Sequence, residues 1–439
     1  MFVVGHQNLL IVVFQTTFRP LLSYSYISEV LDFTKMNKFD PNHIVEAATL
    51  LTQKQSHPSL NSGQMFQLES MVNKQNSLSQ LPTGYGKTYA GICLPDILLI
   101  LKEKFGYMEV SDQPRVLYIV PLLAIMESLE EQLVKLNVSY QFLRSGTTSI
   151  IDDKVKVVAI SPEKITVKET LAIIVSLKWE AIILDEPHLA VEWGIPKKKR
   201  GKSSKPFREA FAKLNKLNQT GTVFQLQTAT AVELPKVFAL LGRKDSSWIK
   251  NILLPERKNL IYFLFSGKNA PSNIMQFDCV VDFLKLDTSA PGALLIYVQR
   301  VDDGSEVFSE INEFCTVNKI LSESGRRFAF LHANLEAERK REIMKLVCDG
   351  SIKVLIATSA VGNGVNLPIL KTILWGLDPE PSGVIQASGR TARFPYDGSG
   401  SVIMVRKHLS LSLTKCITEL AGDEWDCMEW NRCLKSWHI

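Results

Sequence analysis

Several features of specialised proteins are missing from this 439-residue sequence. The apolar run at residues 9–14 is far shorter than the roughly 20 residues that a membrane-spanning helix needs. A signal peptide requires a basic segment before its apolar run, and none precedes this one. The 7 cysteines stand apart from one another without close pairs, so no disulfide framework is implied. We therefore expect reduced thiols and no membrane partner.

The composition is that of an ordinary globular protein. Apolar residues make up 46% and charged residues 22% of the chain, which argues against disorder and against a fibrous repeat. A length of 439 residues allows two or three domains, each with its own core. The formal charge of +5 is small for this length and favours an anionic partner only slightly.

Two series of short apolar runs alternate with longer amphipathic stretches, which is the pattern of parallel sheets wound with helices. The first series predicts strands at residues 77–81, 116–120, 155–160, 181–184 and 223–226. The second predicts strands at residues 293–298, 327–331, 354–356, 372–374 and 401–405. The predicted fold class is therefore α/β, with two lobes that each hold a mostly parallel sheet flanked by helices. Ligands of such sheets bind beyond the carboxyl ends of the strands.

A basic segment with a proline, residues 255–260, separates the two series. We predict a first lobe at residues 45–255, a second lobe at 256–408 and a short tail at 409–439. Residues 1–44 form an N-terminal extension in this scheme. Because the sequence becomes ordinary from Met36, either Met36 is the native start or the extension packs on the folded protein.

A phosphate-binding loop follows the first predicted strand. The segment Leu81-Pro-Thr-Gly-Tyr-Gly-Lys-Thr88 joins a strand to a helix, as such a loop must. Lys87 is expected to reach the β and γ oxygens of ATP, and the Thr88 hydroxyl to bind Mg²⁺. Leu81 stands where the strict pattern has glycine. The phosphates are expected to lie against the backbone of Thr83, Gly84, Tyr85 and Gly86.

An acidic motif follows further along the chain. Asp185-Glu-Pro-His188 stands directly after the apolar run at residues 181–184. A strand-end aspartate, here Asp185, holds Mg²⁺, and the neighbouring Glu186 orients and deprotonates the attacking water. Structural acids at strand ends are common, but this order behind a phosphate loop predicts an ATPase site.

Two further motifs stand in the expected order. Thr228 and Thr230 end another predicted strand, where their hydroxyls are expected to act with His188 in coupling two sites. In the second lobe, the segment Gln386-Ala-Ser-Gly-Arg-Thr-Ala-Arg393 places two arginines about one helical turn apart. Such arginines are either solvated surface or stabilise the transferring phosphoryl group, and we expect the second role. The catalytic candidates of this segment are Gln386, Arg390 and Arg393.

With these motifs in order, the chain resembles the RecQ family of DNA helicases over residues 60–406. Gly63-Gln64 precedes Lys87 at the distance at which that family carries its adenine-recognising glutamine. Val120-Pro-Leu-Leu123 and Ser161-Pro-Glu163 resemble the family's DNA-contacting motifs, and Glu192-Trp-Gly194 with Phe207-Arg208 resembles its aromatic-rich loop. In the second lobe, Arg257-Lys-Asn-Leu260 resembles the start of the family's lobe, and Gly362-Asn-Gly-Val-Asn366 and Leu331-His-Ala333 resemble its motif V region and the segment upstream of it.

The resemblance implies two RecA-like lobes, ATP and Mg²⁺ as cofactors, and movement from 3′ to 5′ on single-stranded or tailed DNA. It implies an adenine contact for Gln64 and a coupling role for Gly364. Trp193 is expected to stack on a base, or else to be a core tryptophan. The implied DNA contacts are Pro121, Ser161, Trp193, Phe207 and Arg208.

Several positions depart from the family pattern. Asn61 replaces an arginine that contacts the nucleotide, Pro187 replaces an alanine, and Asn366 stands where an acid is usual. An insertion at residues 195–206 interrupts the aromatic-rich loop. It holds the basic run Pro196-Lys-Lys-Lys-Arg-Gly-Lys202, which resembles a nuclear import signal and also suits phosphate contacts, although a solvated loop is the plain alternative. On this run we predict a nuclear protein.

Beyond Val405 the resemblance stops. RecQ helicases usually continue with a four-cysteine zinc module and a winged helix, whereas Cys416, Cys427 and Cys433 lack a close pair, so we expect no zinc there. The best reading of the whole chain is an ATP-dependent DNA helicase or translocase. The alternatives are an RNA helicase, a translocase that does not separate strands, and a catalytically weakened ATP-binding scaffold.

Overall fold

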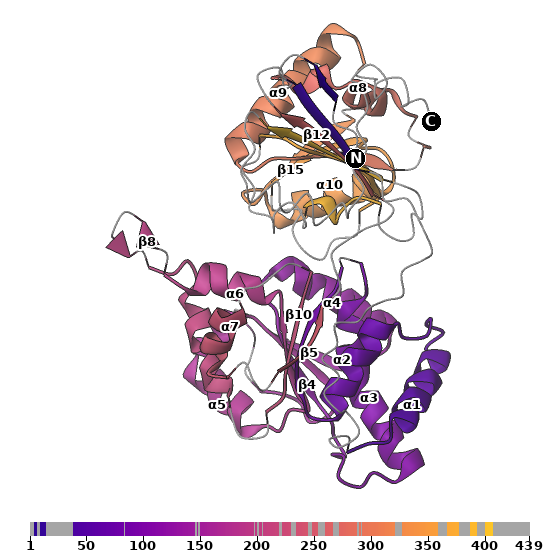
Figure 1. Ribbon diagram of the computed structural model, residues 1–439, viewed down its shortest axis with the longest axis vertical. Coiled ribbons are helices and arrows are strands. Elements are labelled where there is room, and N and C mark those ends of the chain that lie inside the picture. Colours follow the sequence, from indigo (N-terminus) through magenta and orange to yellow (C-terminus); the bar gives the residue numbers. More distant parts are fainter. Residues whose placement is uncertain are drawn as a thin grey trace. The chain divides into compact units, whose positions relative to one another are not determined.

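The computed structural model of the chain divides into two compact units, residues 23–254 and residues 255–439 together with 1–22 (Figure 1). The structure describes residues 4–6, 9–14, 38–82, 84–144, 147, 150–196, 198–199, 202–203, 205–218, 222–229, 234–244, 248–252, 260–266, 272–287, 289–290, 292–320, 327–358, 367–376, 387–392 and 400–406. No helix within these ranges is long and apolar enough to cross a membrane.

The first lobe contains a seven-stranded sheet, and every strand pair in it is parallel. The strands predicted for this lobe are all present, and β5 and β11 are added at the two edges. In sheet order the strands are β11 (Trp248–Ile252), β3 (Asn76–Gln80), β10 (Phe224–Thr228), β7 (Ala181–Asp185), β4 (Val116–Ile119), β6 (Val157–Ile160) and β5 (Tyr140–Leu143).

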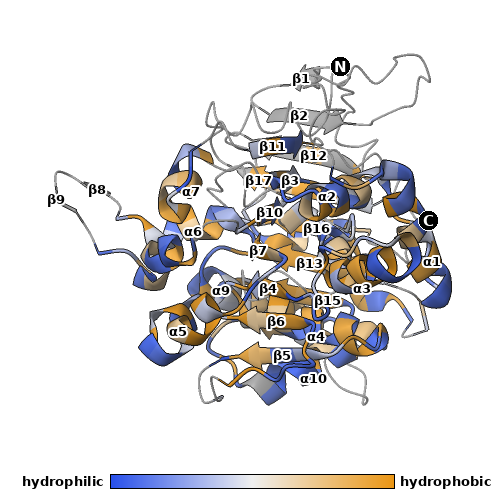
Figure 2. Ribbon diagram, turned by 90° about the horizontal axis from the view of Figure 1, so that it is seen from below, coloured by the Kyte–Doolittle hydropathy of each residue, from blue (hydrophilic) through white to orange (hydrophobic). Residues whose placement is uncertain are grey.

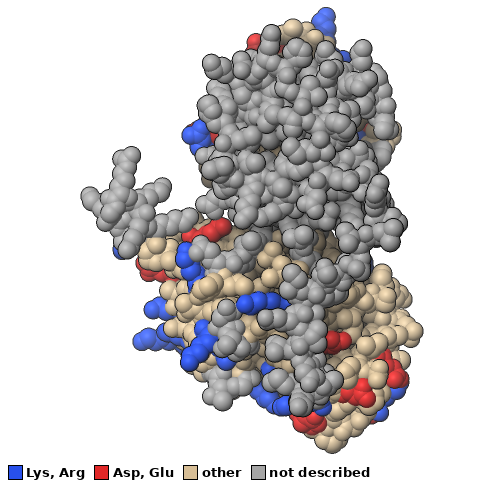
Figure 3. Space-filling view, viewed as in Figure 1, with Lys and Arg blue, Asp and Glu red and all other residues tan. Residues whose placement is uncertain are grey.

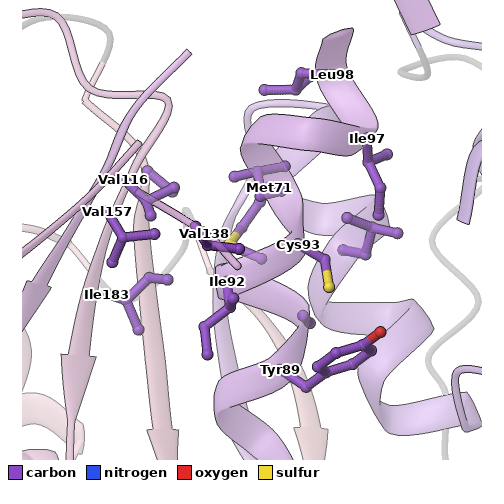
Figure 4. Close-up of a cluster of buried hydrophobic side chains, with 14 of the residues drawn as sticks. Met71, Tyr89, Ile92, Cys93, Ile97, Leu98, Val116, Val138, Val157 and Ile183 are labelled. Carbon is purple, nitrogen blue, oxygen red and sulfur yellow. The ribbon is translucent and has the colours of Figure 1, made fainter. Parts of the chain in front are cut away.

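Helices cover both faces of this sheet, because its central strands are apolar on both sides. One core includes Met71, Ile92 and Val116, which Figure 4 shows meeting between helices and sheet. Its helices are α1 (Pro41–Lys54), α2 (Ser62–Val72), α3 (Lys87–Phe105) and α4 (Leu123–Lys135). The other core is formed with α5 (Lys168–Ser176), α6 (Pro187–Gly194), α7 (Leu234–Leu241) and the 3-10 helices η2 (Pro162–Thr166) and η3 (Glu209–Leu217).

The second lobe is built on an eight-stranded sheet with helices on both faces. The apolar run predicted as part of an extension forms β2, which pairs antiparallel with β12. In sheet order the strands are β1 (Val4–His6), β2 (Leu9–Phe14), β12 (Leu260–Ser266), β17 (Gly400–Arg406), β16 (Ile369–Leu374), β13 (Ala293–Tyr297), β15 (Val354–Ala357) and β14 (Phe328–Leu331). The helices are α8 (Asp278–Lys285), α9 (Val301–Val317), α10 (Ala337–Cys348) and the 3-10 helix η5 (Ile274–Gln276).

Both lobes therefore have the α/β architecture predicted from the sequence. Apolar residues lie in the strands and on the inner faces of the helices, and polar residues lie on the outer faces (Figure 2). On the face of the first lobe shown in Figure 3, basic side chains gather on the α5 side and acidic ones mostly on the α1 side. The basic insertion contains a short antiparallel hairpin, β8 (Lys198–Lys199) with β9 (Lys202–Ser203). The predicted tail at 409–439 lies outside the described residues.

Candidate active site

The phosphate loop leaves the carboxyl end of β3 and enters α3. Gly84 and Gly86 have φ angles of +80° and +77°, a conformation that favours glycine. A Cβ at Gly84 would meet nothing within 4 Å, so open space lies beside the loop at this point. One at Gly86 would lie 2.6 Å from the Gln64 amide nitrogen. The loop thus offers a curved backbone and the N-terminus of a long helix to a phosphate group.

Lys87 begins α3, and its Nζ donates to the carbonyl oxygens of Leu81 and Pro82, each at 3.1 Å. Leu81, the departure from the loop pattern, is fully buried. A Cβ on Gly63 would lie 3.0 Å from both Leu81 methyl carbons, so the missing side chain at Gly63 leaves room for the leucine. Leu81 is therefore accommodated by packing against Gly63.

Gln64 connects α2 to the phosphate loop. Its Nε2 donates to the Gly86 carbonyl at 3.0 Å, and its Oε1 accepts from the Asn61 backbone N–H at 3.0 Å. Asn61 caps α2 in a reciprocal capping box, and its Nδ2 donates to the Tyr85 carbonyl at 3.1 Å. The asparagine that replaces the family's arginine thus holds the loop from the α2 side.

The acidic motif lies at the carboxyl end of β7, beside β10. Glu186 adopts a left-handed conformation with φ of 47° and turns the chain from β7 into α6. Pro187 occupies the first turn of α6, where the N–H that proline lacks would have no helical partner. This explains why proline is tolerated in place of alanine.

Glu186, His188 and Thr228 form a closed set of contacts. The Thr228 hydroxyl donates to Glu186 Oε2 at 2.9 Å, and His188 Nδ1 lies 3.2 Å from the same oxygen. Thr228 Oγ1 and His188 Nδ1 are 3.4 Å apart. All three side chains are buried or nearly so, with 11% of the Glu186 side chain exposed. The structure thus brings the acidic motif into contact with Thr228, and the coupling role of these residues stays a prediction.

The two neighbouring carboxyl groups have different pKa values. Burial, followed by the charge of Glu186, raises the pKa of Asp185 to about 7. Burial alone would also raise the pKa of Glu186, but the contact with His188, the charge of Lys87 and the Thr228 hydrogen bond hold it below the ordinary value. Glu186 is therefore the ionised member of the pair near neutral pH, as a base toward water must be.

Mg²⁺ fits the residues present at this end of the sheet. Hard cations prefer oxygen ligands, and the Asp185 carboxylate and the Thr88 hydroxyl supply them. Burial and then the charge of Glu186 raise the pKa of Asp185, and a bound cation would offset both effects. Asp185 and Thr88 would hold the ion, which would supply positive charge to offset that of the phosphates of ATP. Among the described residues, no group of three or more His, Cys, Asp or Glu side chains is placed to hold a metal ion.

Arg208 lies at the centre of a second group of contacts, which we call the strand-end cluster. Its Nε donates to Glu163 Oε1 at 2.7 Å, its Nη2 lies 2.6 Å from the same oxygen in an ion pair, and its Nη1 donates to the Pro121 carbonyl. Its guanidinium carbon lies 5.3 Å from the ring centroids of both Trp193 and Phe211. Arg208 thus ties together the segment after β4, the 3-10 helix η2 and helix α6.

The other predicted DNA contacts of this lobe differ in exposure. Phe207 is 77% exposed and meets the Trp193 ring edge-on at 5.7 Å. Trp193 is half-buried and packs against the second core, so neither of its two predicted roles is removed. Pro121 is buried and Ser161 is half-buried. Phe207 is the most exposed member of this set.

In the second lobe, Arg390 is 7% exposed and lies in a short described segment, residues 387–392. It lies near Tyr297 at the end of β13, where burial raises the pKa of Tyr297 and the arginine charge opposes that shift. The remaining predicted site residues lie outside the described residues, and these are Thr83, Thr230, Gly364, Gln386 and Arg393.

Two residues that support the phosphate loop were not found from the sequence. Tyr118, buried in β4, donates its hydroxyl to the Thr88 carbonyl at 2.8 Å. Gly91 of α3 faces that hydroxyl, since a Cβ there would lie 2.2 Å from it. A tyrosine inside an apolar strand looks like ordinary core, so only the three-dimensional contact reveals this role.

Two family models match the chain, one in each lobe. Residues 61–231 match the model of the DEAD/DEAH box helicase domain, and residues 275–395 match the model of the helicase conserved C-terminal domain. The first match contains the phosphate loop, the acidic motif and Thr228, and the second contains Arg390.

Relatives with similar sequences are helicases. RecS of Bacillus subtilis, named a probable ATP-dependent DNA helicase, is 24% identical over 82% of this chain and 67% of its own length. The ATP-dependent helicase wrn-1 of Caenorhabditis elegans is 23% identical over 82% of this chain and 32% of its own length. A DExH-box ATP-dependent RNA helicase of Arabidopsis thaliana is 22% identical over 81% of this chain, which spans 18% of that relative.

Solved structures share the fold. The DUF1998 helicase MrfA bound to DNA has a TM-score of 0.62 and 15% identity, with 86% of this chain and 50% of that one covered. Dbp5 of Saccharomyces cerevisiae bound to RNA and ADP BeF3 has a TM-score of 0.56 and 15% identity, with 88% and 98% covered. The two lobes therefore share the RecA-like fold, and the chain carries, in order, the two helicase domains of a nucleic-acid-dependent ATPase, with RecQ helicases among its relatives.

Proposed function

We propose that this chain is a DNA motor that moves 3′ to 5′ along a single strand and uses ATP hydrolysis to separate tailed duplexes. The observation that supports the proposal is a group of residues suited to ATP hydrolysis at the carboxyl end of one sheet. Lys87 lies on the phosphate loop, Asp185 and Glu186 on the acidic motif, and Thr228 beside them.

The chemistry of the site follows from these positions. Lys87 exchanges its carbonyl contacts for the β and γ oxygens of ATP, while Gln64 holds the loop and reads the adenine. Glu186, kept ionised by His188 and Thr228, takes a proton from the attacking water. In this proposal Arg390 and Arg393 of the second lobe stabilise the charge on the transferring phosphoryl group.

The choice of DNA rests on the RecQ-like motifs and on the DNA helicases among the relatives. RNA is the second candidate, since a DExH-box RNA helicase is also among them. Sequence-independent binding is expected, because such motors grip the backbone and stack bases on exposed aromatic rings such as Phe207.

Unwinding of short duplexes with different tails tests the proposal. The full chain should open a duplex with a 3′ DNA tail and leave one with a 5′ tail closed, in the presence of ATP and Mg²⁺. The Glu186→Gln variant should open neither. A preference for RNA tails or for the 5′ tail would overturn the substrate or the polarity, and ATP binding without any opening would favour a translocase or a scaffold.

We further propose that the basic insertion contacts phosphates and directs the protein to the nucleus. Each phosphate neutralised on a single strand contributes about −0.7 to the log–log dependence of affinity on salt. Deleting residues 197–205 should flatten that slope and move a fluorescent fusion out of the nucleus. An unchanged slope with unchanged localisation would leave only a solvated loop.

A further inference from the structure

A groove of about 750 Å³ follows one edge of the sheet in the second lobe. Its floor is β14, the last strand in the order of that sheet. One wall is α9, which contributes Ser305 and Phe308, and the other is α10, which contributes Ile343 and Leu346. The groove is thus an apolar channel along an edge strand, with a helix on each side.

The backbone of β14 presents unused hydrogen-bonding groups to this groove. The carbonyls of Arg327 and Leu331 accept from Val354 and Thr358, so the odd-numbered residues of β14 bond to β15. In a parallel pair successive residues point their N–H and C=O groups to opposite sides. Phe328 and Phe330 therefore direct theirs to the open edge, where no strand within the described residues pairs with them.

The groove is basic as well as apolar. Its lining includes Arg327, Arg339 and His332 but neither aspartate nor glutamate. Arg327 gives one Nη to the Leu286 carbonyl, which leaves further guanidinium donors. Arg339 pairs with Glu342 at 2.5 Å, but both side chains are more than half exposed, so another carboxylate can replace Glu342 at little cost. His332 Nδ1 is buried and has no hydrogen-bond partner among the described residues.

We propose that this edge groove binds an extended acidic peptide segment of a partner protein, which adds to the sheet beside β14. The two outward-facing residues of β14 are spaced by two positions, which is the repeat of a pairing strand. An apolar side chain of the segment enters the channel between α9 and α10, and its acidic side chains meet Arg327 and Arg339.

The sugar–phosphate backbone of a DNA strand fits this groove less well than a peptide backbone. Phosphates supply hydrogen-bond acceptors only, so they leave the outward carbonyls of Phe328 and Phe330 without donors. A peptide strand supplies an N–H and a C=O at each alternate residue and satisfies both kinds of group. The apolar floor also favours a side chain over a hydrated sugar–phosphate backbone.

The test uses an array of fluorescent seven-residue peptides with valine, isoleucine or phenylalanine at the centre and aspartate or glutamate on both sides. Members of the array should bind the full chain, without nucleotide, with dissociation constants on the order of 10 to 100 μM. Versions with lysine in place of the acids should bind at least tenfold more weakly. N-methylation of alternate peptide nitrogens should weaken binding in one register and not in the other.

Charge reversal on α10 supplies a matched pair of variants. Arg339→Glu should weaken peptide binding at least tenfold, whereas Arg341→Glu, an exposed residue of the same helix outside the groove, should leave it nearly unchanged. Equal losses in both variants would mean general charge attraction and would overturn the proposal. No binding by any member of the array up to about 1 mM would overturn it as well.

Amide exchange gives an independent readout. Saturation with peptide should slow exchange at Phe328 and Phe330 about tenfold or more, and leave Ala329, already bonded to β15, unchanged. Protection of those amides by single-stranded DNA instead would make the groove a nucleic-acid surface and end the peptide proposal. Glu186→Gln should retain peptide binding, so failure of the motor and failure of the groove are distinguishable.

Discussion

In the first lobe, the acidic pair of the ATP site is buried, whereas the ion pair of the strand-end cluster is partly exposed. Asp185 is 8% exposed, and its pKa is raised. Glu163, the partner of Arg208, has a side chain that is 49% exposed. Burial makes charge at the ATP site costly and therefore sensitive to single changes, while water screens the strand-end cluster. We propose that the first region performs the hydrolytic chemistry, and the contacts of Arg208 show that the second joins three segments.

The largest effect is expected from Glu186→Gln, which removes the base but keeps the shape of the side chain. General base catalysis is typically worth about 10² to 10⁴ in rate, so turnover should fall by that factor. Nucleotide binding should survive, because Lys87 and the loop are untouched. Turnover and nucleotide affinity measured together check this, with Lys87→Ala as the control that loses both. Near-normal turnover in Glu186→Gln would place the base elsewhere.

Asp185→Asn should stabilise the protein when Mg²⁺ and nucleotide are absent. With a pKa raised to about 7, Asp185 is protonated in the folded state over a pH range where the unfolded chain has lost that proton. The folded state binds more protons there, so stability falls as pH rises from about 4 to 7.

The asparagine variant has no proton to lose at this position, so its stability does not fall in this way as pH rises. Its free energy of unfolding should exceed that of the wild type by on the order of 2 to 4 kcal/mol at pH 8, and by much less at pH 4. Denaturant unfolding in the presence of a chelator measures both values. The same difference at the two pH values would contradict the buried-charge account.

Gly91→Ala should disturb the support of the phosphate loop by packing. The added Cβ would lie 2.2 Å from the Tyr118 hydroxyl and 2.3 Å from Ile183 Cδ1. Overpacking of this kind costs about 1 to 3 kcal/mol. Tyr118→Phe in the same chain should recover part of the loss in denaturant unfolding, since it removes one of the two clashing atoms. An unchanged free energy of unfolding in Gly91→Ala would contradict the close packing of α3 against β4.

Arg208→Ala should have the smallest effect, because its ion pair is partly exposed. The variant should remain folded. The factor by which single-stranded DNA stimulates its ATP turnover should fall about tenfold, equivalent to about 1.4 kcal/mol. Arg243→Ala is the matched control, because Arg243 also lies over an aromatic ring, Phe224, and donates to a backbone carbonyl. Equal effects of the two variants would remove the special role of the strand-end cluster.

The sequence predicted the parts of the fold that follow periodic patterns. Central strands such as β4 and β7 are apolar along their whole length and were predicted within a residue or two. The edge strands β5 and β11 were missed, because their half-buried, partly polar residues resemble loops. The apolar run at 9–14 was recognised but not its pairing with β12, which joins segments far apart in the chain.

The residues of the candidate site also divide into those that the sequence predicted and those that only the structure revealed. Lys87, Asp185 and Glu186 were predicted because each belongs to a short sequence motif whose residue types and spacing indicate its chemistry. Tyr118 and Gly91 were missed because their role is a contact between β4 and α3. Arg208 was predicted as a DNA contact, and only the structure shows its guanidinium held by Glu163 and Pro121.

ATP turnover with and without nucleic acid tests the central claim most directly. The full chain should hydrolyse ATP slowly alone, faster with single-stranded DNA, and less fast with RNA of the same sequence, while Glu186→Gln stays at background in all three. Stimulation by DNA that is absent in Glu186→Gln supports a DNA-driven ATPase built on the acidic motif. Turnover that is absent, or that nucleic acid does not change, would contradict the account.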